Sequence, residues 1–554
     1  MKLLQHFKEL TVRPKNAKEL KGLILKLAIQ GKLTANWRND NPNVESASVL
    51  LCSIIDYNKT LLKSKNKRIK KLPIESGVTL ELLNGWIQTK NHVLFSLTKG
   101  KNPKDLSESK KKYPYQDIES LARGNVRRYS DDEKAVKCTD EDILVVCDGS
   151  RSGLLLEGKV GIVGSTLAII ETAIFIQEYV KLLFLQDYER ANSSMKGAAI
   201  PHLDTKALLN FDIGLPPLEE QKEIVKVVEI LFREVEELEQ LTFERIALKE
   251  DFVTSALNQL TTNNANQEWP FLQDHFKNFF NETRNIKKLR ETVLQLAVQG
   301  KLTADWRANN PDTEDASILL KHIQKEKAQL VKDKEIKKGR SSDTIITDNC
   351  DWVKPNNWVE IELQDLFKFI DYRGKTPVKS KSGKRLITAK NIRMGFIKND
   401  PIEYVSELFY KNWMVRGFPE KGNILFVTEG HTMGFVTQIN LDYEFALAQR
   451  TICFQPFYSM DLTFYYYAIM SQQFQQIIFD NQTGSAASGI KASKLKRIPI
   501  PLPPLEEQKV IVQKVNALMG LCDSLEQEVQ ESQEQIAQLM QSCLREVFEG
   551  SKRY

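Results

Sequence analysis

Two short stretches of the sequence resemble parts of enzymatic motifs, and each lacks a residue that the chemistry requires. GKT at 374–376 is similar to the end of a phosphate-binding loop, but Phe369 stands where that loop needs its first glycine. GSRSG at 149–153 is similar to a nucleophile elbow, but its serines fall at the wrong positions. The motifs of an adenine-N6 methyltransferase do not occur, and the six histidines are far apart. We therefore expect no catalytic residue and no metal site on this chain.

Basic residues gather instead in two regions that are rich in Gly, Ser, Asn and Tyr. Lysines in such loops can neutralise phosphates, and Arg or Asn can hydrogen-bond to guanine or adenine edges. The long helical stretches are acidic or balanced, so a formal net charge of only +6 conceals two basic lobes. Solvated loops without a ligand are the alternative. The basic residues are Lys99, Lys101, Lys104, Lys110, Lys111, Lys112, Arg123, Arg127 and Arg128 in the first region, and Arg373, Lys375, Lys379, Lys381, Lys384, Arg385, Lys390 and Arg393 in the second.

Composition and length narrow the class of protein. With 554 residues, 42% apolar and 27% charged, the chain is predicted to form more than one globular domain. Its seven cysteines are odd in number and form no CxxC pair, which argues against a disulfide framework and for a reducing compartment. No signal pattern and no apolar run of about 18 residues occurs. We expect a cytoplasmic protein without a membrane partner.

The elements that must position the basic regions occur twice. AIQGKLTANWR at 28–38 matches AVQGKLTADWR at 297–307, and each copy ends a predicted helix with a glycine suited to the C-cap, Gly31 or Gly300. Each copy is followed by a turn and then by a second short helix. The predicted helices are 17–30 and 47–54 in the first copy, and 285–299 and 316–323 in the second.

The octapeptide LPPLEEQK recurs without change at 215–222 and 502–509. Its prolines end the incoming segment, and its glutamates suit the start of a helix, where the dipole favours negative charge. The apolar residues that follow have heptad spacing, which after the second copy predicts a coiled-coil seam of about 33 residues, roughly 50 Å long. A pair of ordinary amphipathic helices is the alternative. The seam positions are Ile224, Val228, Leu231, Val235 and Leu238 after the first copy, where the pattern loosens at Thr242, and Ile511, Val515, Leu518, Cys522, Leu525, Val529, Ser532, Ile536, Leu539 and Cys543 after the second.

Between these helical parts lie two segments of a different character. They begin near Trp86 and Trp358, contain short β-like runs such as DILVVC at 142–147 and NILFVT at 423–428, and end in the octapeptide. The helical parts repeat almost verbatim, whereas these mixed segments diverge. The sequence therefore predicts two half-units, each a variable domain on a near-identical helical mount, in a pseudo-twofold internal repeat.

This organisation resembles the specificity subunit of type I restriction–modification systems over almost the whole chain. The most specific features are the paired LPPLEEQK segments with their heptad helices and the paired QGKLTA-x-W elements. The segments at 197–221 and 484–508 and DILVVCDGSRSG at 142–153 add to the resemblance. It implies an α+β fold with two mixed α/β target-recognition domains separated by two long antiparallel coiled-coil spacer helices.

The resemblance also implies domain boundaries and a division of labour. Each recognition domain would read one part of a bipartite, asymmetric site in double-stranded DNA, and the helices would set the spacing and dock two modification subunits. Methylation with S-adenosylmethionine, and cleavage with ATP and Mg²⁺ by restriction/translocase subunits, would belong to those partners, with no cofactor on this chain. The expected parts are an N-terminal helical repeat element and connector at 1–78, recognition domain 1 at 79–214, a central spacer helix with the second helical repeat element at 215–349, recognition domain 2 at 350–501, and a C-terminal spacer helix at 502–554.

Two further readings stay open at this point. The chain could be a coiled-coil scaffold, or a DNA-binding protein that acts outside a restriction system. A spacer of roughly 50 Å can reach two half-sites about one helical turn of DNA, 34 Å, apart, which favours the DNA-reading interpretation.

The candidate DNA-binding residues follow from side-chain type and from their place in loops. Arg and Asn are predicted to read bases, although the matched Asn-Val-Arg and Asn-Ile-Arg triplets could equally be scaffold. Asp148 and Glu429 could accept a hydrogen bond from cytosine or orient an arginine. Candidate base readers are Arg123, Asn125, Arg127, Ser150 and Arg151 in the first domain, and Lys390, Asn391, Arg393, His431 and Thr432 in the second. Candidate phosphate contacts are Lys99, Lys101, Lys375, Lys379 and Lys384, with Arg128 and Arg373 as further DNA-binding residues.

Overall fold

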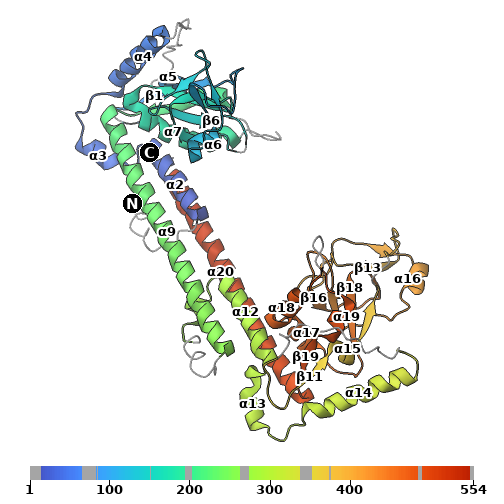
Figure 1. Cartoon of the computed structure of the whole chain (residues 1–554). Coiled ribbons are helices and arrows are strands. Elements are labelled where there is room, and N and C mark those ends of the chain that lie inside the picture. The colour runs from blue at the N-terminus through green and yellow to red at the C-terminus, as the bar shows by residue number, and fades with distance from the viewer. Residues whose placement is uncertain are drawn as a thin grey trace. The chain divides into compact units, whose positions relative to one another are not determined.

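The computed structural model describes residues 14–64, 83, 85–149, 151–193, 203–262, 274–336, 352–372, 376–483 and 489–549. The chain divides into two compact units, Met1–Arg245 with Met540–Tyr554, and Ile246–Leu539. Two 45-residue helices, α9 (Leu218–Thr262) and α20 (Leu505–Glu549), begin inside the two copies of LPPLEEQK. Both are drawn in Figure 1.

The first unit holds a recognition domain built on three small sheets. The largest has the antiparallel order β2-β9-β6-β7, and a second has the order β4-β3-β8-β5 with β3 and β8 parallel. The first and last strands of the domain, β1 and β10, pair with each other so that Ile87 faces Leu215. Chain entry and exit therefore lie side by side, next to the start of α9 (Figure 1). The elements are α2 Pro14–Ile29, α3 Ala35–Asp40, α4 Ala47–Ser64, β1 Ile87–Lys90, α5 Asn91–Leu94, β2 Phe95–Lys99, β3 Tyr113–Gln116, α6 Ile118–Arg123, β4 Tyr129–Ser130, β5 Lys137–Cys138, β6 Ile143–Val146, β7 Leu155–Glu157, β8 Gly161–Val163, β9 Leu167–Thr172, η2 Ile174–Ile176, α7 Gln177–Ser193, α8 Thr205–Leu209 and β10 Asp212–Leu215.

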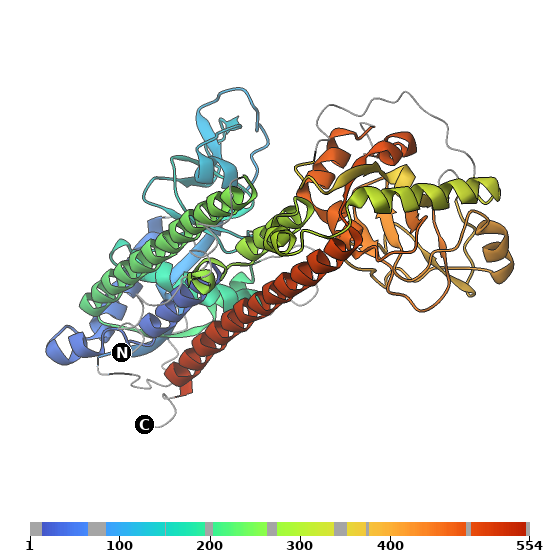
Figure 2. The same ribbon diagram turned by 90° about the horizontal axis from the view of Figure 1, so that it is seen from below.

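The second unit repeats this plan with a different sequence. Its main sheet has the order β12-β18-β15-β16, its smaller sheet the order β14-β13-β17, and β11 pairs with β19 so that Val359 faces Leu502. Figure 2 shows α20, in red, starting beside these strands. The elements are α11 Phe276–Phe279, α12 Thr283–Val298, η3 Lys301–Thr303, α13 Ala304–Asn309, α14 Ala316–Lys332, β11 Val359–Glu362, α15 Leu363–Leu366, β12 Phe367–Asp371, β13 Lys384–Ile387, β14 Tyr404–Val405, α16 Glu407–Trp413, β15 Ile424–Val427, β16 Val436–Gln438, β17 Phe445–Leu447, β18 Thr451–Pro456, α17 Thr463–Met470, α18 Gln472–Asp480, α19 Ala492–Arg497 and β19 Pro499–Leu502.

Most of the elements expected from the sequence are present. The runs at 142–147 and 423–428 form the buried central strands β6 and β15, and Gly31 and Gly300 adopt the left-handed conformation expected at helix ends, with φ of 65° and 68°. The second short helices are longer than predicted, because α4 and α14 continue to Ser64 and Lys332. Lys, Glu, Gln and Ala are good helix formers, so the basic stretch after 324 continues the preceding helix as far as Lys332.

A buried glutamate from the octapeptide holds the first unit together. The Glu220 side chain is fully buried at the start of α9. Its carboxylate accepts hydrogen bonds from the Thr34 hydroxyl at 2.7 Å and the Trp86 indole N–H at 2.7 Å, and forms an ion pair with Arg38 at 2.6 Å. Three segments distant in sequence thus meet at one side chain: the QGKLTA element, the first residue of the recognition domain's core, and the long helix.

Glu507 makes the same junction in the second unit. It is also fully buried, accepts from the Thr303 hydroxyl at 2.7 Å and the Trp358 indole at 2.8 Å, and pairs with Arg307. The preceding Glu506 is exposed and pairs only with Lys509, three residues on. Both glutamates of the octapeptide were expected to interact with the helix dipole, whereas the second one is a buried structural carboxylate.

A glycine is required beside each junction. A Cβ atom on Gly31 would lie 2.8 Å from the Trp86 ring, and one on Gly300 would lie 3.0 Å from the Trp358 ring. Both glycines also have positive φ, which other residues adopt at a cost. The QGKLTA element therefore needs its glycine both for the turn and for close approach of the tryptophan.

The long helices bury their heptad positions against the short repeat helices. In the first unit α2 and α9 share a hydrophobic core that contains Val228 and Leu231, and Lys21 pairs with Glu236 at 2.7 Å. In the second unit α12 and α20 share a core that contains Val515 and Cys522, and Arg290 pairs with Asp523 at 2.6 Å. The predicted apolar seam exists, but its first partner in each half is α2 or α12.

Three helices pack together in the second unit. Lys288 near the start of α12 pairs with Glu250 of α9, and Lys301 after its end donates to the Thr261 carbonyl, so α12 and the end of α9 run in the same direction. Lys514 of α20 donates to the Leu302 carbonyl, so α20 runs the opposite way. Within this unit the two long helices are therefore antiparallel, as expected from the sequence. The buried seam of α20 reaches Val529, and Ser532 is exposed.

Replacing Glu507 by Gln is expected to destabilise the second unit. The neutral side chain would turn an amide N–H₂ toward the donors of Arg307 and Trp358, and loss of one partner from a buried ion pair costs about 3–5 kcal/mol. Urea unfolding, with hydrogen exchange of the segment 355–366 as the local readout, measures the effect. The matched control is Glu506→Gln, at the exposed neighbour, for which we expect no measurable change. Equal midpoints for the two variants would contradict the role assigned to Glu507.

Candidate nucleic-acid interface

In the first unit, the end of β2 and the loop after β6 are joined by an ion pair. Lys99, the last residue of β2, lies 2.7 Å from Asp148, and the Lys99 side chain is half exposed. Lys101 follows on the exposed loop and forms no ion pair within the part of the chain that the structure describes. The predicted phosphate contacts Lys99 and Lys101 thus share one edge of the main sheet, but only Lys101 carries an unneutralised charge.

The loop after β6 in the first unit and the loop after β15 in the second are tight turns with the same backbone pattern. Gly153 donates its N–H to the Val146 carbonyl, and Gly434 donates to the Val427 carbonyl, at 2.6 and 2.9 Å. Arg151 is exposed at the tip of the first turn, and Ser150 lies outside the described residues. In the second turn His431 is exposed and Thr432 is half-buried. Both turns therefore present predicted base readers beyond the end of a central strand.

The basic residues after α6 differ in how far local carboxylates neutralise them. Arg127 pairs with Glu119 at 2.7 Å. Arg128 pairs with Asp117 at 3.1 Å and lies over the Tyr115 ring. Arg123 and Asn125 are exposed and make neither contact. Among the candidates of this segment, these two are exposed without a carboxylate partner in the part of the chain that the structure describes.

The lysine run at 110–112 is used partly for local structure. Lys111 pairs with Asp105, and Lys112 pairs with Glu133. Hydrogen bonds from Lys112, Lys137 and Tyr113 lower the pKa of Glu133 to about 2. Glu133 therefore stays ionised at any pH near neutrality, and this run adds less positive charge to the surface than the sequence suggests.

In the second unit, two predicted phosphate contacts are paired with carboxylates. Lys379 lies 2.7 Å from Glu403, and Lys384 lies 2.8 Å from Glu444. The hydrogen bond that Lys384 donates to Glu444 raises the pKa of Lys384 above its usual value. Arg373 and Lys375, with most of the GKT stretch, lie outside the described residues.

Asn391 is buried, and this position favours the scaffold alternative over base reading. Its side-chain oxygen accepts from the Thr388 backbone N–H at 3.0 Å, and its amide donates to the carbonyls of Lys398 and Pro401 at 3.1 and 3.0 Å. The aligned Asn125 is exposed, so the two triplets are not structurally equivalent. A fully used amide at the base of a loop cannot reach a base edge without breaking that loop.

The flanking residues of that loop come close to the His431 turn. The chain reverses between Arg393 and Phe396, and Gly395 at the reversal donates its N–H to the Val436 carbonyl at 3.0 Å. Val436 begins β16, directly after the turn at 429–434. Lys390 is exposed, and Arg393 is half-buried with its guanidinium donating to the Ile392 carbonyl. The fold thus brings together two groups of predicted base readers that are far apart in sequence.

Sequence reasoning missed a charged residue at the same sheet edge. Arg450 precedes β18 with a φ of 78°, a conformation rare for residues other than glycine, and its Nε atom lies 3.8 Å from a Glu429 oxygen. Both line an open depression of about 490 Å³, together with Asp371 and Lys491. Asp371 is the last residue of β12, whereas β2, the corresponding strand of the first unit, ends in Lys99. The signal available in the sequence was the position of Arg450 immediately before a predicted strand.

The described ranges contain no cluster of side chains with the composition of a metal site. No three His, Cys, Asp or Glu side chains there gather to hold a metal ion. Cys52, Cys138, Cys147, Cys453 and Cys522 are free thiols, and burial raises the pKa of Cys138 and Cys147 to about 11. None of the helices searched in the described part is long and apolar enough to cross a membrane.

Comparison with known proteins identifies the class. The family described as type I restriction modification DNA specificity domain matches residues 85–248 and 355–535. The EcoAI specificity subunit of Escherichia coli is 28% identical over 92% of this chain and 90% of its own length. The EcoBI specificity subunit of Escherichia coli is 23% identical over 88% of this chain and 90% of its own length. The type I restriction–modification system S subunit from M. genitalium has a TM-score of 0.28 at 13% identity, covering 83% of this chain and 95% of that one.

The family match covers more than half of the chain, in two segments that correspond to the two recognition domains with the starts of their long helices. The chain therefore belongs to the type I restriction–modification DNA specificity family, and its function is to provide DNA specificity in such a system.

Replacing Lys101 by Ala is expected to weaken binding to all DNA sequences to the same degree. A lysine that contacts a phosphate releases about one counterion, so its loss should reduce the slope of log K against log salt by about 1. The measurement is a salt titration of DNA binding by the assembled complex, with a matched control in Lys112→Ala, whose charge Glu133 already neutralises. A Lys101 variant with altered sequence preference and an unchanged slope would show that Lys101 reads a base.

Proposed function

We propose that each recognition domain reads one part of a bipartite, asymmetric DNA site, and that the helical parts set the distance between the two readings. One observation carries this proposal. The buried glutamate junctions of the two units are alike, whereas the charged residues at the sheet edges of the two recognition domains differ. Glu220 and Glu507 make the same contacts, whereas the sheet edges differ: Lys99 pairs with Asp148 in one domain, and Arg450 lies near Glu429 in the other. Two domains with different charged edges should prefer different bases.

The chain itself takes no part in bond chemistry in this proposal. Two modification subunits would bind S-adenosylmethionine and methylate adenine, and restriction/translocase subunits would use ATP and Mg²⁺. The support on this chain is its set of side chains, in which the candidate residues are cations and amides suited to phosphates and base edges. The complex would act on double-stranded DNA in the cytoplasm.

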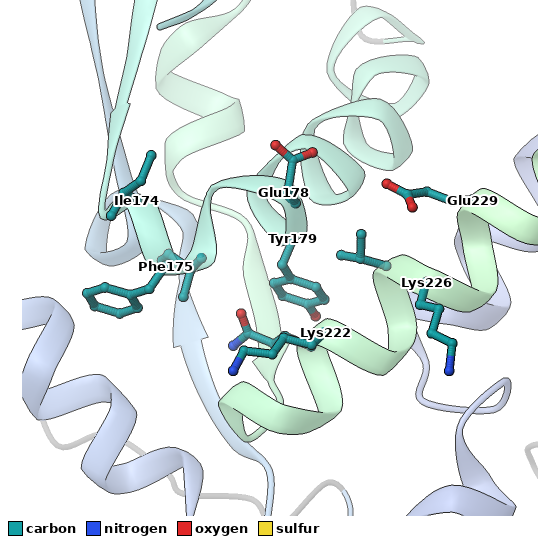
Figure 3. A pocket seen from close by; sticks show the side chains of 10 residues that line it. Ile174, Phe175, Glu178, Tyr179, Lys222, Lys226 and Glu229 are labelled. Atoms are coloured by element: carbon teal, nitrogen blue, oxygen red, sulfur yellow. The ribbon is translucent and has the colours of Figure 1, made fainter. Parts of the chain in front are cut away.

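A docking surface for one modification subunit is proposed where α9 leaves the first recognition domain. A pocket of about 280 Å³ is lined by η2, α7 and the first turns of α9. Ile174 and Phe175 are 64% and 40% exposed there. Figure 3 shows these two side chains on one side of the pocket and Lys226 of α9 on the other, with the Tyr179 ring between them and Lys222 below that ring. Apolar side chains with charges of both signs around them are typical of a protein interface.

Replacing Phe175 by Asp is expected to weaken binding of the modification subunit, because a charge would enter the apolar part of this surface. The measurement is the amount of modification subunit that co-purifies with the chain. Val160→Asp is the control, since Val160 is 58% exposed in the same unit but does not line the pocket. Unchanged co-purification for Phe175→Asp would remove this surface from the proposal without affecting DNA reading.

Mapping methylated adenines in the host genome, with and without the gene, tests the proposed function. We expect one bipartite motif with two different halves to lose its methylation on deletion and to regain it on complementation. Survival of every motif after deletion would contradict the proposal and favour a scaffold or a DNA-binding role outside a restriction system. A palindromic motif would contradict the asymmetry alone.

A further inference from the structure

The loop that Asn391 anchors in the second unit exposes an aromatic side chain at its tip. Ile392 faces Ile397 across a short antiparallel bridge, and Arg393 donates its N–H to the Phe396 carbonyl at 2.9 Å, so the chain forms a tight turn. Gly395 within the turn has a φ of 96°. The Phe396 side chain is 57% exposed. A ligand that covered this ring would remove its apolar surface from water, which is favourable.

This turn is held at both ends. At its base, the Asn391 backbone carbonyl accepts from the Lys398 N–H at 2.7 Å, in addition to the side-chain hydrogen bonds of Asn391. At its tip, Gly395 is tied to the Val436 carbonyl. Met394, between them, packs partly buried against the core of the unit. These contacts fix the backbone that carries Phe396. The entropy cost of an interaction made by its ring is therefore lower.

The charges beside Phe396 indicate what kind of ligand would cover it. Lys390, Arg393 and Lys398 flank the turn, and none forms an ion pair within the ranges that the structure describes. The predicted phosphate contacts Lys379 and Lys384 of the same domain are, by contrast, neutralised by carboxylates. Unpaired cations around an apolar tip suit the phosphates and stacked bases of a duplex, whereas lysine is depleted in the cores of protein interfaces.

We propose that Phe396 is an aromatic wedge that stacks on a base step of the half-site read by the second domain. Lys390, Arg393 and Lys398 would hold the flanking phosphates. This proposal rests on the proposed function. Apolar side chains inserted at a base step partly unstack it, so sequence steps that unstack easily would be favoured without a hydrogen bond to any base. Phe396 would thus contribute to sequence specificity without a hydrogen bond to a base.

In the first domain, the described segment after Asn125, which aligns with Asn391, has no exposed aromatic side chain at a turn. After Asn125 the chain continues through Arg127 and Arg128, whose guanidinium groups form local ion pairs, to Tyr129 in β4, which is half-buried. The wedge therefore belongs to one half-site only. Distortion of the DNA is expected on the side that the second domain reads.

The experiment uses the full chain assembled with its modification subunits and a duplex carrying the site identified by methylation mapping. 2-Aminopurine is placed at successive positions of each half-site, because its fluorescence rises when it unstacks. We expect a rise at one step in the half read by the second domain, lost in Phe396→Ala and kept in Phe396→Trp. Stacking of one ring contributes about 1–3 kcal/mol, so Phe396→Ala should bind about 5- to 150-fold more weakly.

The matched control is Tyr443→Ala in the same domain. Tyr443 is 49% exposed, and its neighbours Asp442 and Glu444 already pair with Lys421 and Lys384. No unpaired cation adjoins it in sequence to hold a phosphate, so its removal should leave affinity and fluorescence unchanged. The salt slope should be the same for wild type and Phe396→Ala, because the cations remain. Retained activity of Phe396→Trp would exclude a folding defect as the cause.

Two outcomes would overturn the wedge. One is sequence-specific binding by the wild-type complex with equal affinity and fluorescence in Phe396→Ala. The other is a loss of modification subunits from Phe396→Ala, which would make Phe396 part of a protein interface. Failure of the wild-type complex to bind any mapped site would instead overturn the proposed function on which the wedge rests.

Discussion

The structure of each half depends on one buried carboxylate. Removing a carboxylate from water is costly, and it is tolerated only when enough donors replace the water. Glu220 and Glu507 each have three kinds of donor: a threonine hydroxyl, an indole N–H and a guanidinium. These donors come from different segments, so the carboxylate is satisfied only when the helical repeat element, the recognition domain and the long helix are all in place. Formation of the junction therefore couples the folding of three elements.

This arrangement leaves the recognition domain free to change. Its first and last strands pair with each other, β1 with β10 and β11 with β19. Its hydrogen bonds to the buried glutamates come from residues just before the first strand, Trp86 in one domain and Asn357 and Trp358 in the other. Lys99 and Arg450 are not among the residues that donate to these glutamates. The sheet edges can therefore change in sequence while the glutamate junctions stay the same. This separation accounts for helical parts that repeat almost verbatim beside recognition domains that diverge.

Some of this was predictable from the sequence because it depends on local patterns. Heptad spacing, glycine at a helix end and β-rich runs gave the long helices, the turns and the central strands. The role of Glu220 was not predictable, because adjacent glutamates in a first helical turn look equivalent until one faces solvent and the other faces Arg38. Asn125 and Asn391 likewise have the same neighbours in sequence, and only the fold shows that one is exposed and the other is saturated by its own loop.

The number of basic residues in the sequence overestimates the charge available to DNA, because only the fold shows which of them are paired with carboxylates. Lys99, Arg127, Lys379 and Lys384 each have a carboxylate partner, most of them more than a dozen residues away in sequence. A paired lysine must give up that partner before it neutralises a phosphate, which reduces the net gain, whereas an unpaired one gives up only water and counterions. Affinity should therefore concentrate at the few unpaired cations. In the second domain Lys390, Arg393 and Lys398 are unpaired among the described residues and flank Phe396, so the same turn would supply both backbone contacts and a reading of base stacking.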